Sequence, residues 1–206
     1  MEITWLGHAS FKLKTKEQFI YIDPYYGDYQ EKASIILVSH GHYDHASIEK
    51  INQIRTDSTI IITTKEVASM IDGAIGLSEN EERLIENVKI RATPMYSNTH
   101  RRGTGIGFII ETEKKKVYFA GDSGFMDEMK DIKADILLLP IGGTYTMGAK
   151  EAAKAVLLIH PKIAIPMHYG SGIVGTLEDA ELFKELVESK SDIHVRILGH
   201  GGTISV

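Results

Sequence analysis

The chain has 206 residues, of which 43% are hydrophobic and 25% are charged, an ordinary composition for one globular domain. Its formal charge of −5 and its pI near 6.0 argue against a general nucleic-acid binder, which carries a basic surface. The chain has no cysteine, which excludes disulfides and thiolate metal sites, so any metal must be held by histidine, carboxylate or water.

The N-terminal stretch MEITWLGHASFKLK lacks the basic segment followed by an apolar segment that marks a signal peptide. No apolar run approaches the ~18 residues that a membrane span needs. We therefore expect a cytoplasmic protein without a membrane partner.

The first half of the chain begins with short alternating segments, residues 2–6, 10–14 and 19–23, which predict an antiparallel meander. The apolar run 35–38 is typical of an interior strand and leads directly into a histidine cluster. Further along this half we expect a helix over 46–54 capped by Ser47, a strand over 59–64, a helix over 65–71, strand-like segments within 83–92, and a hairpin of 105–112 with 115–122.

The second half alternates buried strands with amphipathic helices. The expected elements are strands over 134–140 and 162–167, helices over 148–160 and 176–189, the latter capped by Thr176, and terminal strands over 194–198 and 202–206. No linker rich in proline or glycine divides the chain. We expect an α/β protein of two sheets covered by helices, in a single domain over residues 1–206.

The segment VSHGHYDHAS carries His40, His42, Asp44 and His45 within six positions at the end of the predicted interior strand. A histidine-rich surface loop is the alternative, but such density directly after a buried strand favours a metal site. One metal cannot comfortably take all four side chains, whereas two neighbouring metals can, with His40 and His42 on one and Asp44 and His45 on the other.

The form HxHxDH of this segment resembles the signature of the metallo-β-lactamase superfamily, and the likeness extends from Trp5 to about Gly175. The resemblance implies an αββα sandwich, with two mixed sheets flanked by helices and a metal site at one edge. WLGHASF, GGTYTM and PMHYG look most like a branch of small metal-dependent hydrolases related to the bacterial ascorbate-phosphate lactonase.

The resemblance also implies the remaining ligands, each following a strand or loop that matches the family pattern. The implied set is His40, His42 and His100 for the first metal, Asp44, His45 and His168 for the second, Asp122 as the bridge between them, and Asp23 as a support for the ligand loop. Of these, His100 is the weakest assignment because it lies in a polar loop rather than at a strand end.

His8, between Gly7 and Ala9, is interpreted either as a proton donor or substrate contact, or as a loop histidine satisfied by the backbone. We place it with Asp44 as a candidate catalytic residue. Arg101 and Arg102 directly follow His100 and would suit an anionic substrate group, although paired arginines are more often merely exposed.

The remaining candidates are more simply explained by structure than by function. Packing or surface roles are favoured for Tyr145, Tyr169, His160, His194 and His200, while Gly142 and Gly143 permit close backbone approach, with substrate as one candidate.

We expect a dinuclear metal-dependent hydrolase in which a hydroxide shared by the metals attacks an ester, lactone, amide or phosphoester. The expected cofactors are two divalent ions, with zinc favoured over manganese, iron or nickel. The expected partner is a small molecule, with an anionic group as one option, and a homo-oligomer is left open. The alternatives are a metal-dependent ribonuclease or phosphodiesterase, an iron-dependent oxidoreductase on the same fold, and a non-catalytic metal-binding protein.

Overall fold

The computed structural model describes residues 1–206, which fold as two compact units. The first unit comprises Met1–Ser78 together with Leu198–Val206, and the second comprises Glu79–Ile197. None of the helices has the length and apolar character required to cross a lipid bilayer. The single domain expected over residues 1–206 stays a prediction.

The first unit is built on a seven-stranded mixed sheet with the strand order β14-β1-β2-β3-β4-β5-β6. Its elements are β1 (Glu2–Gly7), β2 (Ser10–Lys14), β3 (Phe19–Ile22), β4 (Ile35–Leu37), α1 (Ile48–Ile54), β5 (Ile60–Thr64), α2 (Lys65–Ala68), β6 (Ile75–Leu77) and β14 (Thr203–Ser205). The pairs from β14 to β3 are antiparallel, and those from β3 to β6 are parallel. The predicted meander is therefore confirmed.

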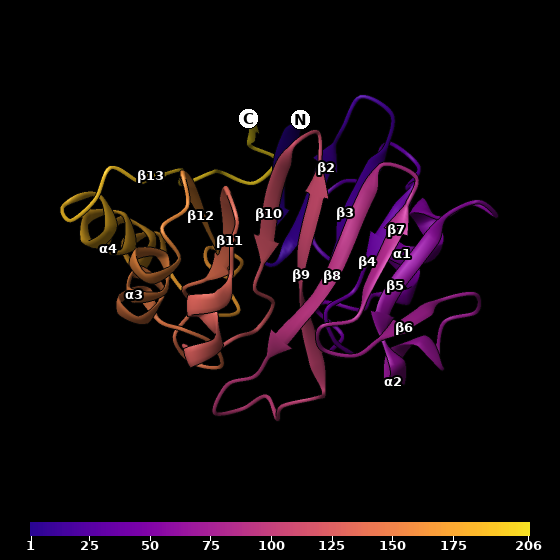
Figure 1. Cartoon of the computed structure of the whole chain (residues 1–206), viewed down its shortest axis with the longest axis horizontal. Helices are drawn as coiled ribbons and strands as arrows, with labels where there is room; N and C mark the ends of the chain where they lie inside the picture. Colours follow the sequence, from indigo (N-terminus) through magenta and orange to yellow (C-terminus); the bar gives the residue numbers. More distant parts are fainter. The chain divides into compact units, whose positions relative to one another are not determined.

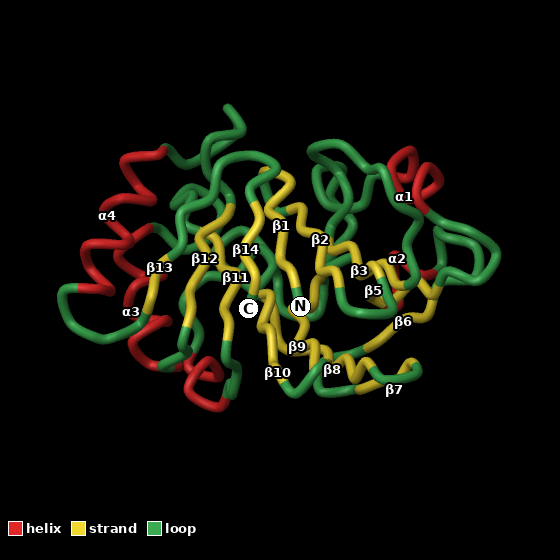
Figure 2. Tube along the Cα trace, turned by 90° about the horizontal axis from the view of Figure 1, so that it is seen from above, coloured by secondary structure: helices red, strands yellow, loops and turns green.

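The core of this unit forms where α1 and α2 pack on the sheet, and Figure 2 shows α2 beside β5 and β6. Ile51 and Ile54 of α1 are buried with Ile36 and Val38 of the β4 region. Ser47 caps α1 as predicted, accepting a hydrogen bond from the Lys50 backbone.

The second unit repeats this arrangement with the strand order β13-β12-β11-β10-β9-β8-β7. Its elements are β7 (Glu82–Ile85), β8 (Val88–Met95), β9 (Gly105–Thr112), β10 (Lys115–Phe119), the 3-10 helix η1 (Asp127–Asp131), β11 (Ile136–Pro140), α3 (Ala149–Ile159), β12 (Ile163–Met167), α4 (Leu177–Glu188) and β13 (His194–Val195). The pairs from β7 to β10 are antiparallel and those from β10 to β13 are parallel.

In Figure 1, α3 and α4 lie beside β12 at the parallel end of this second sheet. The helix α4 buries Ala180, Phe183 and Val187, the face that its sequence predicts, and Thr176 forms its capping box with Asp179. In both units, the loops at the carboxyl ends of the parallel strands carry the candidate ligands, as is common for sites on such sheets.

Candidate metal centre

The first unit gathers His8, Asp23, His40, His42, Asp44 and His45, here called the first cluster. The ring centroids of His40 and His42 are 4.6 Å apart, and those of His40 and His45 are 4.2 Å apart. His40 and His45 are buried, whereas His42 is exposed and Asp44 is partly exposed. The cluster therefore has a buried base and an accessible end.

Asp23, which directly follows β3, holds this base together through its two carboxylate oxygens. Oδ1 accepts a hydrogen bond from the Ser39 backbone at 2.7 Å, while Oδ2 accepts one from the Ser39 hydroxyl at 2.6 Å and one from His45 Nδ1 at 2.7 Å. Because Nδ1 of His45 carries the proton, its neutral ring presents the Nε2 lone pair. A carboxylate behind a ligand histidine is the usual way in which metal sites orient imidazole.

His40 is fixed in the same tautomer by Ser39. The Ser39 hydroxyl donates its proton to Asp23, so it must accept the 2.9 Å hydrogen bond from His40 Nδ1. This leaves the His40 Nε2 lone pair directed at His42 Nδ1, 3.1 Å away. Two nitrogen ligands of one tetrahedral zinc ion lie roughly 3.3 Å apart, so this spacing fits a shared ion.

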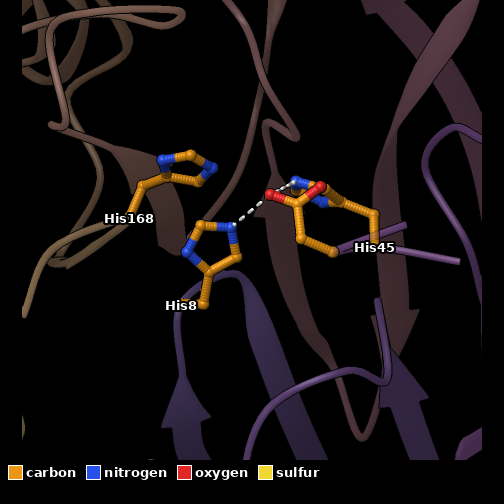
Figure 3. A group of neighbouring side chains, drawn as sticks. His8, His45 and His168 are labelled. Atoms are coloured by element: carbon orange, nitrogen blue, oxygen red, sulfur yellow. Dashed lines mark hydrogen bonds and ion pairs between the residues drawn. The ribbon is translucent and has the colours of Figure 1, made fainter. Parts of the chain in front are cut away.

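His8 contacts the other end of the ligand loop. Its Nε2 donates to Asp44 Oδ2 at 3.0 Å, which is the dashed line that starts at the labelled His8 in Figure 3. Burial raises the pKa of the Asp44 carboxyl, but the hydrogen bond from His8 and the proximity of His45 outweigh it and lower the pKa to about 2. The His8 ring is fully buried, and its carbonyl accepts a hydrogen bond from the Trp5 indole at 3.0 Å.

The second unit gathers His100, Asp122 and His168, here called the second cluster. The Asp122 carboxylate lies between the two histidines. Its Oδ1 is 3.2 Å from His168 Nε2, and its Oδ2 is 3.6 Å from His100 Nε2. All three residues are buried. A carboxylate between two imidazoles is the arrangement expected of a bridging ligand.

His100, the ligand assigned with the weakest support from the sequence, is oriented by hydroxyl groups rather than by a carboxylate. Its Nδ1 lies 3.0 Å from the Ser97 hydroxyl and 3.3 Å from that of Thr99. Both hydroxyls donate to the carbonyl of Tyr145, at 2.7 and 2.9 Å, so both accept from the imidazole. His100 therefore presents its Nε2 lone pair on the side of Asp122.

Backbone strain accompanies three residues of these clusters. His8, Asp23 and His168 have φ values of 51°, 44° and 66°, in the left-handed region that non-glycine residues seldom adopt. Each lies directly after a strand or in a tight turn between two strands. Such strain is characteristic of functional sites, where the surrounding structure holds a side chain in a required direction.

The arginines after His100 differ in their surroundings. Arg102 forms ion pairs with Glu79 at 2.8 Å and with Glu128 at 2.7 Å, and it lies over the Tyr96 ring at 5.3 Å. These contacts occupy its guanidinium, which leaves Arg101, an exposed side chain, as the only member of the pair available to an anionic substrate group.

Gly142 permits a close backbone approach, as predicted. The group that it approaches is His168, a candidate metal ligand, rather than a substrate. A Cβ atom at this position would lie 2.9 Å from the carbonyl oxygen of His168 and 3.2 Å from its Nδ1. Among the other histidines, His160 is the exposed C-cap of α3, and His200 packs edge-on against Trp5 with ring centroids 5.0 Å apart.

The supporting residues Ser39, Ser97 and Thr99 were not anticipated from the sequence. Serine and threonine are too common to indicate a site, and the carbonyl that orients Ser97 and Thr99 belongs to Tyr145, more than 40 positions away. The only sequence feature that indicates such a supporting role is the position of Ser39 directly before His40.

Taken unit by unit, the donor sets fit metal ions. Buried imidazoles with fixed lone pairs and buried carboxylates gather in each cluster, and buried charged groups in proteins are normally paired or bound to metal. Nitrogen and carboxylate oxygen donors without sulfur suit zinc, manganese or iron. The ligand roles of the individual residues stay predictions.

Comparison with known proteins agrees with these donor sets. The β-lactamase superfamily domain matches residues 2–168. A UPF0173 metal-dependent hydrolase of Methanopyrus kandleri is 35% identical, with 98% of each chain covered. A crystal structure of a proposed metal-dependent hydrolase from Parabacteroides distasonis has a TM-score of 0.86 at 34% identity, covering 95% of this chain and 91% of that one.

Igni18, a metallo hydrolase from the archaeon Ignicoccus hospitalis, has a TM-score of 0.85 at 26% identity, covering 98% of this chain and 97% of that one. These likenesses confirm the predicted fold class, an α/β protein of the metallo-β-lactamase type with two mixed sheets and flanking helices. The chain belongs to the metallo-β-lactamase superfamily, in the branch of the UPF0173 metal-dependent hydrolases.

Proposed function

We propose that this metal-dependent hydrolase uses two divalent ions, with zinc as the first choice, to cleave an ester, lactone, amide or phosphoester bond in a small molecule. In this proposal, Asp122 is shared between the two ions. The other ligands are His40, His42 and His100 for one ion, and Asp44, His45 and His168 for the other.

The observation that carries the proposal is the fixed tautomer of three buried histidines. Asp23 and Ser39 accept hydrogen bonds from the Nδ1–H groups of His45 and His40, while Ser97 and Thr99 accept the one from His100. Each neutral ring therefore keeps an Nε2 lone pair. Such support is typical of metal sites, where the second ring nitrogen of a ligand histidine donates a hydrogen bond to a carboxylate, a carbonyl or water.

When bound, such ions lower the pKa of a water molecule and polarise the electrophilic oxygen of the substrate. The protein orients the ligands through Asp23, Ser39 and Ser97. His8 holds Asp44 through the 3.0 Å hydrogen bond, and its proposed further role is to donate a proton to the leaving group.

Elemental analysis of the purified protein, expressed without added metal, tests the metal part of this proposal. We expect close to two equivalents of zinc in the wild type, and a clear loss in Asp122→Asn and His100→Ala variants. One equivalent or less of any metal, even after addition of zinc or manganese, would contradict a dinuclear centre.

A substrate panel tests the chemical part. Metal-loaded protein should hydrolyse at least one of a lactone, an aryl ester and a phosphodiester, and a metal chelator should abolish this activity. Bound iron with oxygen uptake would favour the oxidoreductase instead, and cleavage of a structured RNA would favour the nuclease. Inactivity on the whole panel would favour a non-catalytic metal-binding protein. The cytoplasmic location and a homo-oligomeric state stay predictions.

A further inference from the structure

A cavity of about 220 Å³ lies among three loops of the second unit. These loops follow β8, β10 and β11, which run in the same direction, so they meet at one edge of the sheet. Two of them also carry His100 and Asp122. The cavity therefore adjoins the second cluster.

Hydrogen bonds tie the three loops to one another. The Ser97 hydroxyl donates to the Tyr145 carbonyl at 2.7 Å, and the Gly124 backbone donates to the Tyr96 carbonyl at 2.8 Å. The third connection runs from the Met147 backbone to the Ser123 carbonyl at 2.9 Å. Hydrogen bonds between the three loops therefore hold the walls of the cavity in place. One of these walls includes Ser97, which orients His100.

The lining combines aromatic rings with hydroxyl and amide groups and has a single ionisable carboxyl group. Its rings are those of Tyr96, Phe125 and Tyr145, and its polar side chains include Asn98, Thr144 and Glu151. No lysine, arginine or histidine lines it.

A phosphate or carboxylate in this cavity would meet Glu151 and no cation. The guanidinium of Arg102, on the Tyr96 ring, is already bound by Glu79 and Glu128. Hydroxyl groups, in contrast, can both donate to Glu151 and pair with the amide of Asn98. Aromatic rings add flat apolar surfaces, on which the C–H faces of a saturated ring can pack.

We propose that this cavity is the subsite for an uncharged, hydroxyl-rich ring of the substrate, which would place a bond of that ring, or one directly attached to it, at the second cluster. This inference rests on the proposed hydrolase function and adds to it the class of substrate. The volume is below the ~300 Å³ at which sites for drug-sized ligands begin, which suits one ring.

Three lactones with the same six-membered ester ring test the inference: glucono-1,5-lactone, its 6-phosphate and δ-valerolactone. Hydrolysis by metal-loaded protein is followed in a pH-stat and corrected for the spontaneous rate. We expect kcat/KM for gluconolactone to exceed that for each of the other two at least about tenfold. A site built for hydroxyl groups rejects δ-valerolactone, which lacks them, and the charge of the 6-phosphate would meet Glu151 and no cation. Equal values for the three lactones, or a preference for the phosphate, would overturn the inference.

Variants connect this preference to the cavity. Asn98→Ala combined with Thr144→Val should raise KM for gluconolactone and leave δ-valerolactone unchanged. Glu151→Gln, which keeps an acceptor for the Gly148 backbone, should improve the 6-phosphate relative to gluconolactone. Asn52→Ala, at an exposed position on α1, is the matched control and should change neither. An equal effect of the double variant on all three lactones would indicate a general disturbance and contradict the subsite.

A binding experiment separates failure of the subsite from failure of the proposed function. If no lactone is hydrolysed, saturation-transfer NMR with 1,5-anhydroglucitol, an uncharged ring that cannot be hydrolysed, tests the cavity directly. Binding that is lost in the Asn98→Ala, Thr144→Val variant would support the subsite without the reaction. Absence of binding to the wild-type protein would overturn it.

Discussion

Among single residues, Asp23 orients two candidate metal ligands, His45 directly and His40 through Ser39, without being a predicted ligand itself. It is fully buried and accepts hydrogen bonds from the Ser39 backbone, the Ser39 hydroxyl and His45. Through Ser39 it also acts on His40. One carboxylate therefore sets the direction of two lone pairs in the first cluster.

We predict that Asp23→Asn lowers the affinity for zinc by about 10- to 100-fold, the range found when a group that supports a metal ligand is removed. The amide can donate where the carboxylate only accepts, so it no longer fixes the Nδ1 proton of His45. Titration against a chromogenic chelator measures this affinity. Asp28→Asn, at an exposed position, is the control, and equal affinities in the two variants would contradict the role.

Two roles are proposed for His8, proton donation to the leaving group and the positioning of Asp44, and the choice of leaving group distinguishes them. If His8 donates a proton to the leaving group, His8→Ala should lower kcat by about 10²- to 10⁴-fold for an alkyl ester. It should barely change kcat for a p-nitrophenyl ester, because that leaving group departs without a proton. His194→Ala, at an exposed position, serves as the control. A similar loss on both esters would assign His8 to positioning alone.

Among the secondary-structure elements, the loop after β11 supports the end of β12 through Gly142. A side chain at this position would meet the carbonyl and the Nδ1 atom of His168, which is itself in a strained left-handed conformation. The tightness of this contact means that the loop and the candidate ligand cannot shift independently.

We therefore predict that Gly142→Ala displaces His168 and reduces bound metal, while the circular dichroism spectrum stays that of the wild type. The new Cβ would lie 2.9 Å from the carbonyl oxygen, closer than packed atoms tolerate. Gly199→Ala meets no atom within 4 Å and should retain full metal content. Full metal content in Gly142→Ala would show that the loop yields without moving the ligand.

Elements with strong local signals were predictable from the sequence, and elements that depend on tertiary pairing were less so. The caps at Ser47 and Thr176 and the buried faces of α3 and α4 follow from residue type and spacing. β6 was missed because it is only three residues long, contains Gly76, and is defined by its pairing with β5. The strand expected over 194–198 pairs with β12 only at His194–Val195, and its last hydrogen bond to β12 runs from the Arg196 backbone to the Ala164 carbonyl at 2.9 Å.

The candidate ligands were predictable because the density of histidine and aspartate at strand ends is rare in ordinary sequence. Their supporting hydroxyls and the polar cavity were not, because both depend on which distant loops meet. The Ser97 hydroxyl is oriented by the carbonyl of Tyr145, 48 positions away, and Glu151 of α3 lines the cavity together with Tyr96 of a distant loop.

Across the whole molecule, the predicted ligand set draws on both compact units, with Asp44 and His45 in one and Asp122 and His168 in the other. If these residues share ions, zinc must stabilise both units together. At a free zinc concentration 100 times Kd, binding adds about 2.7 kcal/mol to the free energy of unfolding. For a chain of this length, that corresponds to a rise in Tm of roughly 5 to 11 °C.

Hydrogen exchange followed by mass spectrometry provides the sharper measurement. Removal of zinc should speed exchange in both β4 and β11, and Asp122→Ala, which removes the carboxylate proposed to be shared by the two ions, should reduce the zinc-dependent protection of β4 although the substitution lies in the other unit. His194→Ala should leave that protection intact. If zinc protects β4 equally in Asp122→Ala and in the wild type, then the first cluster binds its metal alone, and the shared dinuclear centre is wrong.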